Sequence, residues 1–141
     1  MGALVVVLAT VATVALCVVV HYEGLAYTSK RIPSGKRNMR LKVLVGIAAV
    51  IALHAVEIAF FGIASQLLVL WPECGRIDGA TLFVDHLYFS AMNYTTVGVP
   101  DLLAVGPLRF LAATEALTGL VLIAWSASFT FLEMEQYWRG R

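Results

Sequence analysis

The stretch that decides the fold reads N-Y-T-T-V-G-V-P-D and covers residues 93–101. This stretch begins at the end of a helix-like segment, 81–94. That segment has about 14 residues, or roughly 21 Å of helix, and is too short to cross a bilayer. Asp78, Thr81 and Asp85 suit the N-terminal end of this short helix. Backbone that leaves a helix inside a membrane finds no partner in lipid, so protein must surround it or it must line a watery path. Residues 93–101 therefore predict the lining of a pore.

The rest of the chain is apolar enough to place this stretch in a membrane. The 141 residues are 60% hydrophobic and 13% charged, with a mean hydropathy of +0.85, whereas a soluble domain of this size needs a mostly polar shell. Segments 3–20, 43–70 and 108–132 each approach or exceed the roughly 20 apolar residues of a spanning helix. We therefore predict an all-α membrane protein with three transmembrane helices, and a re-entrant pore helix and loop between the second and third.

A cluster of basic residues sets the predicted orientation. Its members are Lys30, Arg31, Lys36, Arg37, Arg40 and Lys42. The positive-inside rule places this cluster in the cytoplasm, so the N-terminus is expected outside the plasma membrane and the C-terminus inside. The predicted organisation is an N-terminal transmembrane helix over 1–27, a basic cytoplasmic loop over 28–42, a pore module over 43–133 and a short cytoplasmic tail over 134–141. The first helix is expected to stay as an anchor, because no positive charge precedes it as in a cleaved signal peptide.

The loop resembles the T-T-V-G-Y-G-D selectivity filter of the potassium-channel pore family. The resembling residues are Thr95, Thr96, Val97, Gly98, Val99, Pro100 and Asp101. Five of the seven positions agree, and the loop stands between a pore helix and an inner helix as it does in the family. The similarity covers about residues 41–132, and the small bacterial channels with two helices around the pore loop look most similar.

The resemblance implies a fold and a function. Four copies of the loop surround one axis, so the chain would be a subunit of a homotetramer in contact with membrane lipid, conducting K⁺ or Na⁺ passively along residues 95–101. Gly119 falls where family members often carry a gating hinge in the inner helix. No cofactor, nucleic-acid partner or enzymatic activity is expected, and no metal other than the permeant monovalent cations.

The loop departs from the family pattern in its outer half. Pro100 replaces a glycine, and its ring fixes φ near −65°, which excludes the left-handed conformation. Val99 replaces a tyrosine, and Phe89, at the position of its usual hydrogen-bonding partner, has no donor. We therefore expect weakened or altered potassium selectivity. The alternative is a non-conducting homologue that serves as an accessory or scaffold membrane subunit.

Several polar residues inside the predicted helices require partners, because each would be costly if it faced lipid. For His54, Glu57 and Glu115 two roles are open: structural hydrogen bonding, and proton sensing that controls the pore. Metal binding by these three residues is not expected, since no fuller ligand set is visible in the sequence. His21 is expected at the inner interface in contact with headgroups, and His86 in packing.

The polar face of the third helix and the two cysteines give two further predictions. Small polar residues share one face of the third helix, suited either to a hydrated cavity or to close helix packing. They are Thr114, Thr118, Ser126 and Thr130. Cys17 is expected within the membrane and Cys74 in the outer loop, so the two cannot meet within one subunit and both are predicted to be free thiols. The alternative is a Cys74 link between neighbouring subunits.

Overall fold

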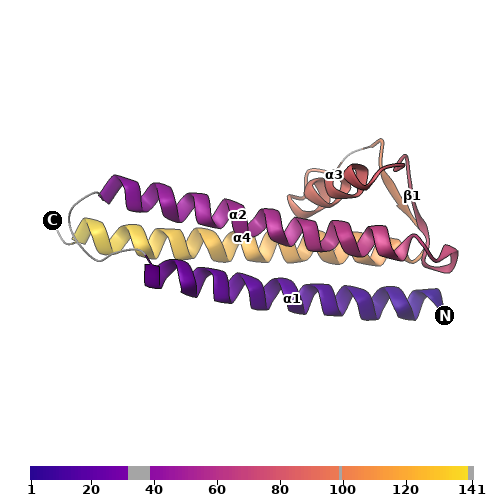
Figure 1. Ribbon diagram of the computed structural model, residues 1–141, viewed down its shortest axis with the longest axis horizontal. Helices are drawn as coiled ribbons and strands as arrows, with labels where there is room; N and C mark the ends of the chain where they lie inside the picture. Colours follow the sequence, from indigo (N-terminus) through magenta and orange to yellow (C-terminus); the bar gives the residue numbers. More distant parts are fainter. Residues whose placement is uncertain (32–38, 99, 140–141) are drawn as a thin grey trace.

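The computed structural model describes residues 1–31, 39–98 and 100–139. Within these residues three long helices lie side by side: α1 (Gly2–Arg31), α2 (Met39–Leu68) and α4 (Leu108–Arg139), as Figure 1 shows. Each contains a segment long and apolar enough to cross a membrane, namely Gly2–Arg31, Val43–Leu68 and Leu108–Glu135. The predicted all-α membrane architecture is confirmed.

The long helices extend further than the hydropathy pattern predicted. α1 continues to Arg31, beyond the predicted boundary at 27, and the side chain of Arg31 lies over the ring of Tyr27 at 5.0 Å. α4 continues to Arg139, so most of the predicted tail, 134–141, is helical. A helix satisfies its own backbone hydrogen bonds and does not have to stop at the edge of the hydrocarbon layer. Hydropathy therefore marks where the membrane ends and not where the helix ends.

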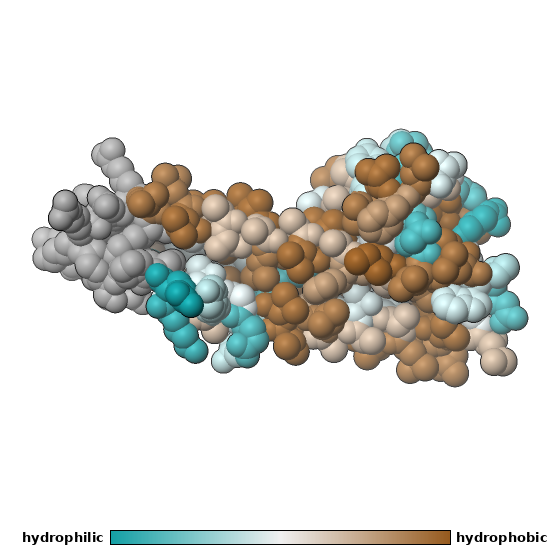
Figure 2. Space-filling model, viewed as in Figure 1, coloured by the Kyte–Doolittle hydropathy of each residue, from teal (hydrophilic) through white to brown (hydrophobic). Residues whose placement is uncertain are grey.

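Apolar side chains cover the outside of the long helices. Leu44 and Leu117, on α2 and α4, are each 63% exposed within the single chain. Figure 2 shows hydrophobic side chains along the length of the molecule and hydrophilic ones gathered toward its ends. An exposed surface of this kind is stable against lipid or against another apolar protein surface, and not against water.

The re-entrant segment lies at one end of the bundle and is held at its base. The short helix α3 (Phe83–Tyr94) packs against α2 and α4. Before it, the 3₁₀ helix η1 (Pro72–Cys74) follows the end of α2, and β1 (Arg76–Asp78) pairs in antiparallel fashion with β2 (Leu103–Val105), which follows the loop. The strands therefore join the chain on both sides of the pore loop.

The N-terminal end of α3 is capped by Asp85. One carboxylate oxygen of Asp85 accepts hydrogen bonds from the backbone N–H groups of Leu82 and Thr81, both at 2.7 Å. These bonds stabilise the charged form and hold the pKa of Asp85 below its ordinary value of 3.8. The expectation that Asp78 shares this task is wrong, because Asp78 lies on β1 and pairs with Arg76 at 2.6 Å.

Contacts at the two ends fix the relative topology. The amino group of Met1 lies 3.9 Å from Glu73 in η1, and Ser29 donates a hydrogen bond to Glu133 at 3.1 Å at the opposite end. The start of α1 and the re-entrant segment therefore share one end of the bundle, as expected. Cys17 and Cys74 are both buried free thiols within the subunit, as predicted, and a Cys74 link between subunits stays a prediction.

Candidate functional site

The loop after α3 has unusual backbone geometry. The N–H groups of Thr96 and Gly98 donate to the carbonyl oxygens of Asn93 (2.8 Å) and Met92 (2.9 Å), so the chain stays tied to the last turn of α3. The φ angle is 61° at Thr96 and 66° at Gly98. A β-branched residue at positive φ is strained by roughly 1–3 kcal/mol, and strain of this kind is concentrated at functional sites.

The positive φ angles fall at alternate positions, and the next position in the series is Pro100. Proline cannot adopt a positive φ, so the alternation ends there. Val99, between Gly98 and Pro100, lies outside the described residues. Phe89, the residue at the position of the usual hydrogen-bonding partner, is buried on α3.

The end of α3 lies about halfway through the bundle. The hydroxyl of Tyr94, the last residue of α3, donates to the carboxylate of Glu57. Glu57 is about 11 residues, or roughly 16 Å, from the end of α2 at Leu68. This depth is about half of a hydrocarbon layer of roughly 30 Å. The following residues, 95–98, are nevertheless exposed in the single chain.

Gly119 has a contact that explains the absence of a side chain. A Cβ at this position would overlap the carbonyl oxygen of Tyr94 and come within 2.9 Å of its ring. Glycine therefore lets the end of α3 rest directly on α4, which passes through residue 119 as a continuous helix. The gating-hinge role stays a prediction.

Glu115 is buried behind the pore helix. Its carboxyl contacts the hydroxyl of Ser90 on α3, and the same hydroxyl lies 2.7 Å from the carbonyl oxygen of Ile58 on α2. One hydroxyl proton cannot serve two acceptors, and both contacts are satisfied when Glu115 carries a proton and donates. Glu115 thus links α4 to α3, apart from His54 and Glu57, with which the sequence analysis had grouped it.

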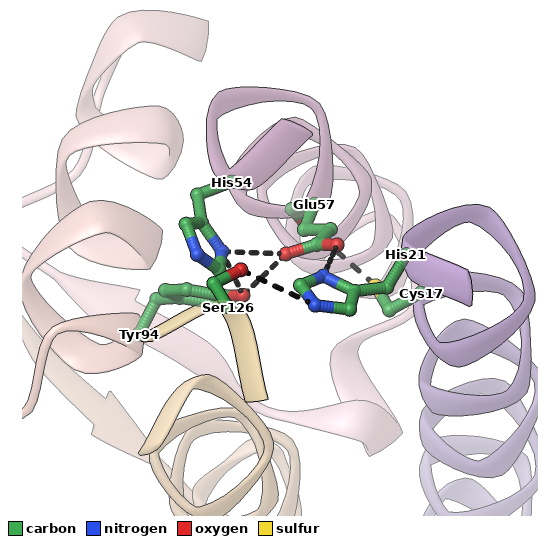
Figure 3. Close-up of polar contacts among 6 residues, drawn as sticks. All are labelled: Cys17, His21, His54, Glu57, Tyr94 and Ser126. Carbon is green, nitrogen blue, oxygen red and sulfur yellow. Dashed lines mark hydrogen bonds and ion pairs between the residues drawn. The ribbon is translucent and has the colours of Figure 1, made fainter. Parts of the chain in front are cut away.

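Glu57 is the centre of a buried polar cluster that joins every long helix to α3 (Figure 3). One of its carboxylate oxygens lies 2.7 Å from Nδ1 of His21 on α1, and the other lies 2.9 Å from Nδ1 of His54. The hydroxyl of Tyr94 is also 2.9 Å from Nδ1 of His54. Oγ of Ser126 on α4 lies 3.3 Å from Nε2 of His21.

The expectation for His21 is wrong. Its side chain is fully buried and paired with Glu57, and it does not contact headgroups at an interface. The sequence gives little sign of this, because apolar residues surround α1 on every side, and the inward face becomes visible only in the structure. The buried residues of α1 recur at helical spacing and form one stripe, so His21 belongs to the face that packs inward. They are Gly2, Val6, Thr10, Cys17, His21 and Leu25.

The structural role of the intramembrane polar groups has direct support. Among the described residues, no buried side-chain nitrogen or oxygen lacks a hydrogen-bond partner. His54, Glu57 and Glu115 all contribute to this arrangement, as does His86, whose Nδ1 is 2.9 Å from the hydroxyl of Ser65. The proton-sensing alternative stays a prediction.

The small polar residues of α4 favour the packing alternative. Thr118 and Ser126 are buried within the single chain. The hydroxyl of Thr118 donates to the carbonyl of Thr114 at 2.7 Å, and that of Thr130 to the carbonyl of Ser126 at 2.8 Å. Thr118 and Ser126 therefore face the packed interior of the single chain, whereas Thr130, with Ser126, also lines a hollow between α2 and α4.

Comparisons with known proteins agree with this architecture. A family model described as "ion channel" matches residues 50–136, which include most of α2, α3, the loop and nearly all of α4. The match leaves out α1. No curated protein and no solved structure matches the chain.

Proposed function

The chain belongs to the ion channel family, and from this premise we propose that it is the subunit of a homotetrameric channel that conducts monovalent cations passively. The match is consistent with the potassium-channel pore family, and the chain is a multi-pass membrane protein whose family transports ions and does not catalyse reactions. The proposal places it in a plasma membrane with its N-terminus outside. The proposed pathway runs along residues 95–101.

The observation that carries the proposal is a non-helical loop, exposed at mid-depth, for whose carbonyl groups a partner is needed. Residues 95–98 follow Tyr94, which lies roughly 16 Å below the end of α2, and they are uncovered in the single chain. Lipid cannot satisfy such groups, so other copies of the chain, together with ions or water, must do so. A symmetric tetramer with the loops at its centre meets this requirement.

Two further features support cation conduction. The C-terminal end of α3 carries the partial negative charge of the helix dipole, and it stops beside the loop at the depth where a cation is least hydrated. Thr96 keeps a strained backbone conformation that a purely packed loop does not require.

We also propose that the channel discriminates poorly between potassium and sodium. Pro100 prevents the alternating backbone from continuing past Gly98, so fewer carbonyl groups can replace the hydration shell of the ion. Bi-ionic reversal potentials in planar bilayers test this. A potassium preference above about 100-fold, which corresponds to roughly 2.7 kcal/mol, would contradict it.

Conduction itself is tested by flux of K⁺, Na⁺ and Rb⁺ into liposomes that contain the purified protein. The decisive variant is Gly98→Ala, because a Cβ at Gly98 meets nothing within 4 Å but the φ of 66° is unfavourable for alanine. The matched control is Gly106→Ala, with a φ of 76° and a Cβ position 3.4 Å from Gly75, away from the loop. We expect Gly98→Ala to lose most of the flux and Gly106→Ala to keep it.

Pro100 also supports the rival function, a non-conducting accessory or scaffold subunit, since a loop that no longer conducts has no need of the family's second glycine. A wild-type protein that is monomeric in detergent, or tetrameric but without flux for any of the three ions, would favour this rival.

A further inference from the structure

We propose that His21, His54 and Glu57 form a binding site for a divalent transition-metal ion of the Zn²⁺ class, inside the helical bundle and apart from the conducting loop. The sequence analysis had considered His54 and Glu57 with Glu115 and found too few ligands. The structure removes Glu115 from this set and adds His21, which completes two imidazoles and one carboxylate.

The donor atoms are already gathered around one point. One ring nitrogen of His21, one of His54 and a carboxylate oxygen of Glu57 all lie within 4.8 Å of one another. In a tetrahedral zinc site with metal–ligand distances of about 2.0–2.1 Å, neighbouring ligand atoms are roughly 3.3 Å apart. The present separations of 2.7 Å and 2.9 Å between the imidazoles and the carboxylate differ from this by less than about 1 Å. The two contacts are to different oxygens of Glu57, Oε1 and Oε2, so an ion would also require side-chain rotation that turns both imidazoles toward one centre.

The chemistry of the donors suits a borderline-soft ion. Two imidazoles and one carboxylate form a recurrent zinc ligand set that leaves a fourth position for another oxygen. Tyr94 supplies an oxygen beside that position, because its hydroxyl contacts both Glu57 and Nδ1 of His54. A divalent ion would also balance the charge of a carboxylate that is fully buried.

The surroundings provide an outer shell for the site. Ser126 lies against Nε2 of His21 at 3.3 Å, a contact that orients the ring so that Nδ1 faces Glu57. A hollow of about 480 Å³ lies beside His54, between α2 and α4, and apolar side chains such as Val50, Ile123 and Phe131 form most of its lining. The side chain of His54 is 16% exposed, so this ligand lies at the edge of the bundle, whereas those of His21 and Glu57 lie in its core.

The position of the site connects it to the loop. Its ligands come from α1 and α2, and Tyr94 is the residue immediately before Thr95. An ion bound here would fix the end of the pore helix relative to α1, which lies outside the matched channel region. Metal binding would thus give the additional N-terminal helix a means of acting on the pore.

The test is metal binding by the purified full-length protein, which does not depend on conduction. Zn²⁺ titrated calorimetrically into metal-free protein should bind at one ion per chain and raise the melting temperature. Co²⁺ should give the intense visible absorption of a tetrahedral site, without the thiolate charge-transfer bands that Cys17 or Cys74 would add. Absence of saturable binding by the wild-type protein would overturn the proposal, whatever the flux experiments show.

Variants locate the ion. His21→Asn and Glu57→Gln should each weaken Zn²⁺ binding at least 10-fold, and Ser126→Ala by roughly 10-fold through the outer shell. His86→Asn is the matched control, since His86 is buried but paired with Ser65 of α2, about two helical turns before Tyr94 on α3. Wild-type affinity in a helical, tetramer-sized His21→Asn protein would refute the assignment. If that variant does not fold, the Co²⁺ spectrum of the wild-type protein still tests the assignment. It distinguishes a tetrahedral site of nitrogen and oxygen ligands from any other ligand set.

Discussion

Three alternate residues of the loop determine what its backbone can do. Thr96 and Gly98 have positive φ angles, and Pro100 cannot have one. Threonine accepts this conformation only with strain, glycine accepts it freely, and proline ends the series. The inner half of the proposed pathway can therefore keep the backbone pattern of the family, while the outer half must differ.

Replacing Pro100 tests this division. We expect Pro100→Gly to raise the preference for potassium over sodium by at least 10-fold, or about 1.4 kcal/mol, because the alternation can then continue for one more step. Reversal potentials under bi-ionic conditions measure the effect. Pro107→Ala, in the turn between β2 and α4, is the control and should leave selectivity unchanged. Equal selectivity in the two variants would show that Pro100 does not limit the pathway.

Gly119 offers a second test on single residues. Gly119→Ala should destabilise the protein by roughly 1–3 kcal/mol, because the new methyl group meets the backbone carbonyl of Tyr94 and cannot move it easily. Gly62→Ala, whose Cβ would mainly meet the end of the Leu87 side chain at 2.8 Å, should have the smaller effect. Thermal unfolding in detergent provides the comparison. A Gly119→Ala protein that keeps its stability but no longer opens would favour the hinge over the contact.

Variants of Glu115 distinguish a structural role of its carboxyl group from a proton-sensing role. Because Glu115 satisfies Ser90 as a donor, an amide can take its place, and we expect Glu115→Gln to stay within about 0.5 kcal/mol of wild type. Glu115→Ala should be less stable, since it leaves a cavity and an unpaired hydroxyl. Flux measured from acidic to neutral pH completes the test. A shifted pH profile in Glu115→Gln would establish the sensing role instead.

At the scale of elements, the sequence predicted what depends on length and hydropathy. The three spans and the short helix were found because about 20 apolar residues cross a membrane and 12–14 do not. β1 and β2 were missed, because strands of three residues show no periodicity and their pairing joins Arg76 to Val105, far apart in the chain. The signal that remained was the set of glycines at their ends, including Gly75 and Gly106 with positive φ angles.

The start of α3 gives a prediction for pH. The pKa of Asp85 is lowered, so its capping contribution is fully present above the ordinary value near 3.8 and is lost as pH falls through the lower folded value. Asp85→Asn should therefore melt below wild type at pH 7, and the difference should shrink below pH 3.8. Asp78→Asn, which removes only an exposed ion pair with Arg76, should change little at either pH. A difference between wild type and Asp85→Asn that does not depend on pH would argue against the cap.

At the scale of the whole molecule, the cluster around Glu57 could be predicted only in part. His54 and Glu57 stand one turn apart on one helix, and the sequence identified them as a pair. His21 and Tyr94 come from other elements and meet them only once α1 and α3 have packed against α2. A membrane helix without a strong polar face gives little sign of which side faces protein, so the partner of a buried charge stays hidden.

The cluster also predicts how far the pore module depends on α1. A chain that begins at residue 39 leaves Glu57 without His21, so it should melt well below the full chain, since an uncovered carboxylate in lipid costs several kcal/mol. Glu57→Leu should partly restore the melting temperature of the truncated chain. In the full chain it should lower the melting temperature, because it leaves His21 buried without its carboxylate partner. Melting temperatures of the four proteins measure this coupling. Additive effects would show that α1 does not compensate Glu57.

The pairing of β1 with β2 has a practical consequence for engineering. The antiparallel pairing of β1 with β2 closes the base of the pore segment, so residues 76–105 contain the contacts that hold their two ends together. A chimera that transfers residues 76–105 as a whole between related channels keeps the pairing of β1 with β2. A graft of residues 83–101 alone would lose both strands, and the conformation of the loop would then depend on the recipient protein.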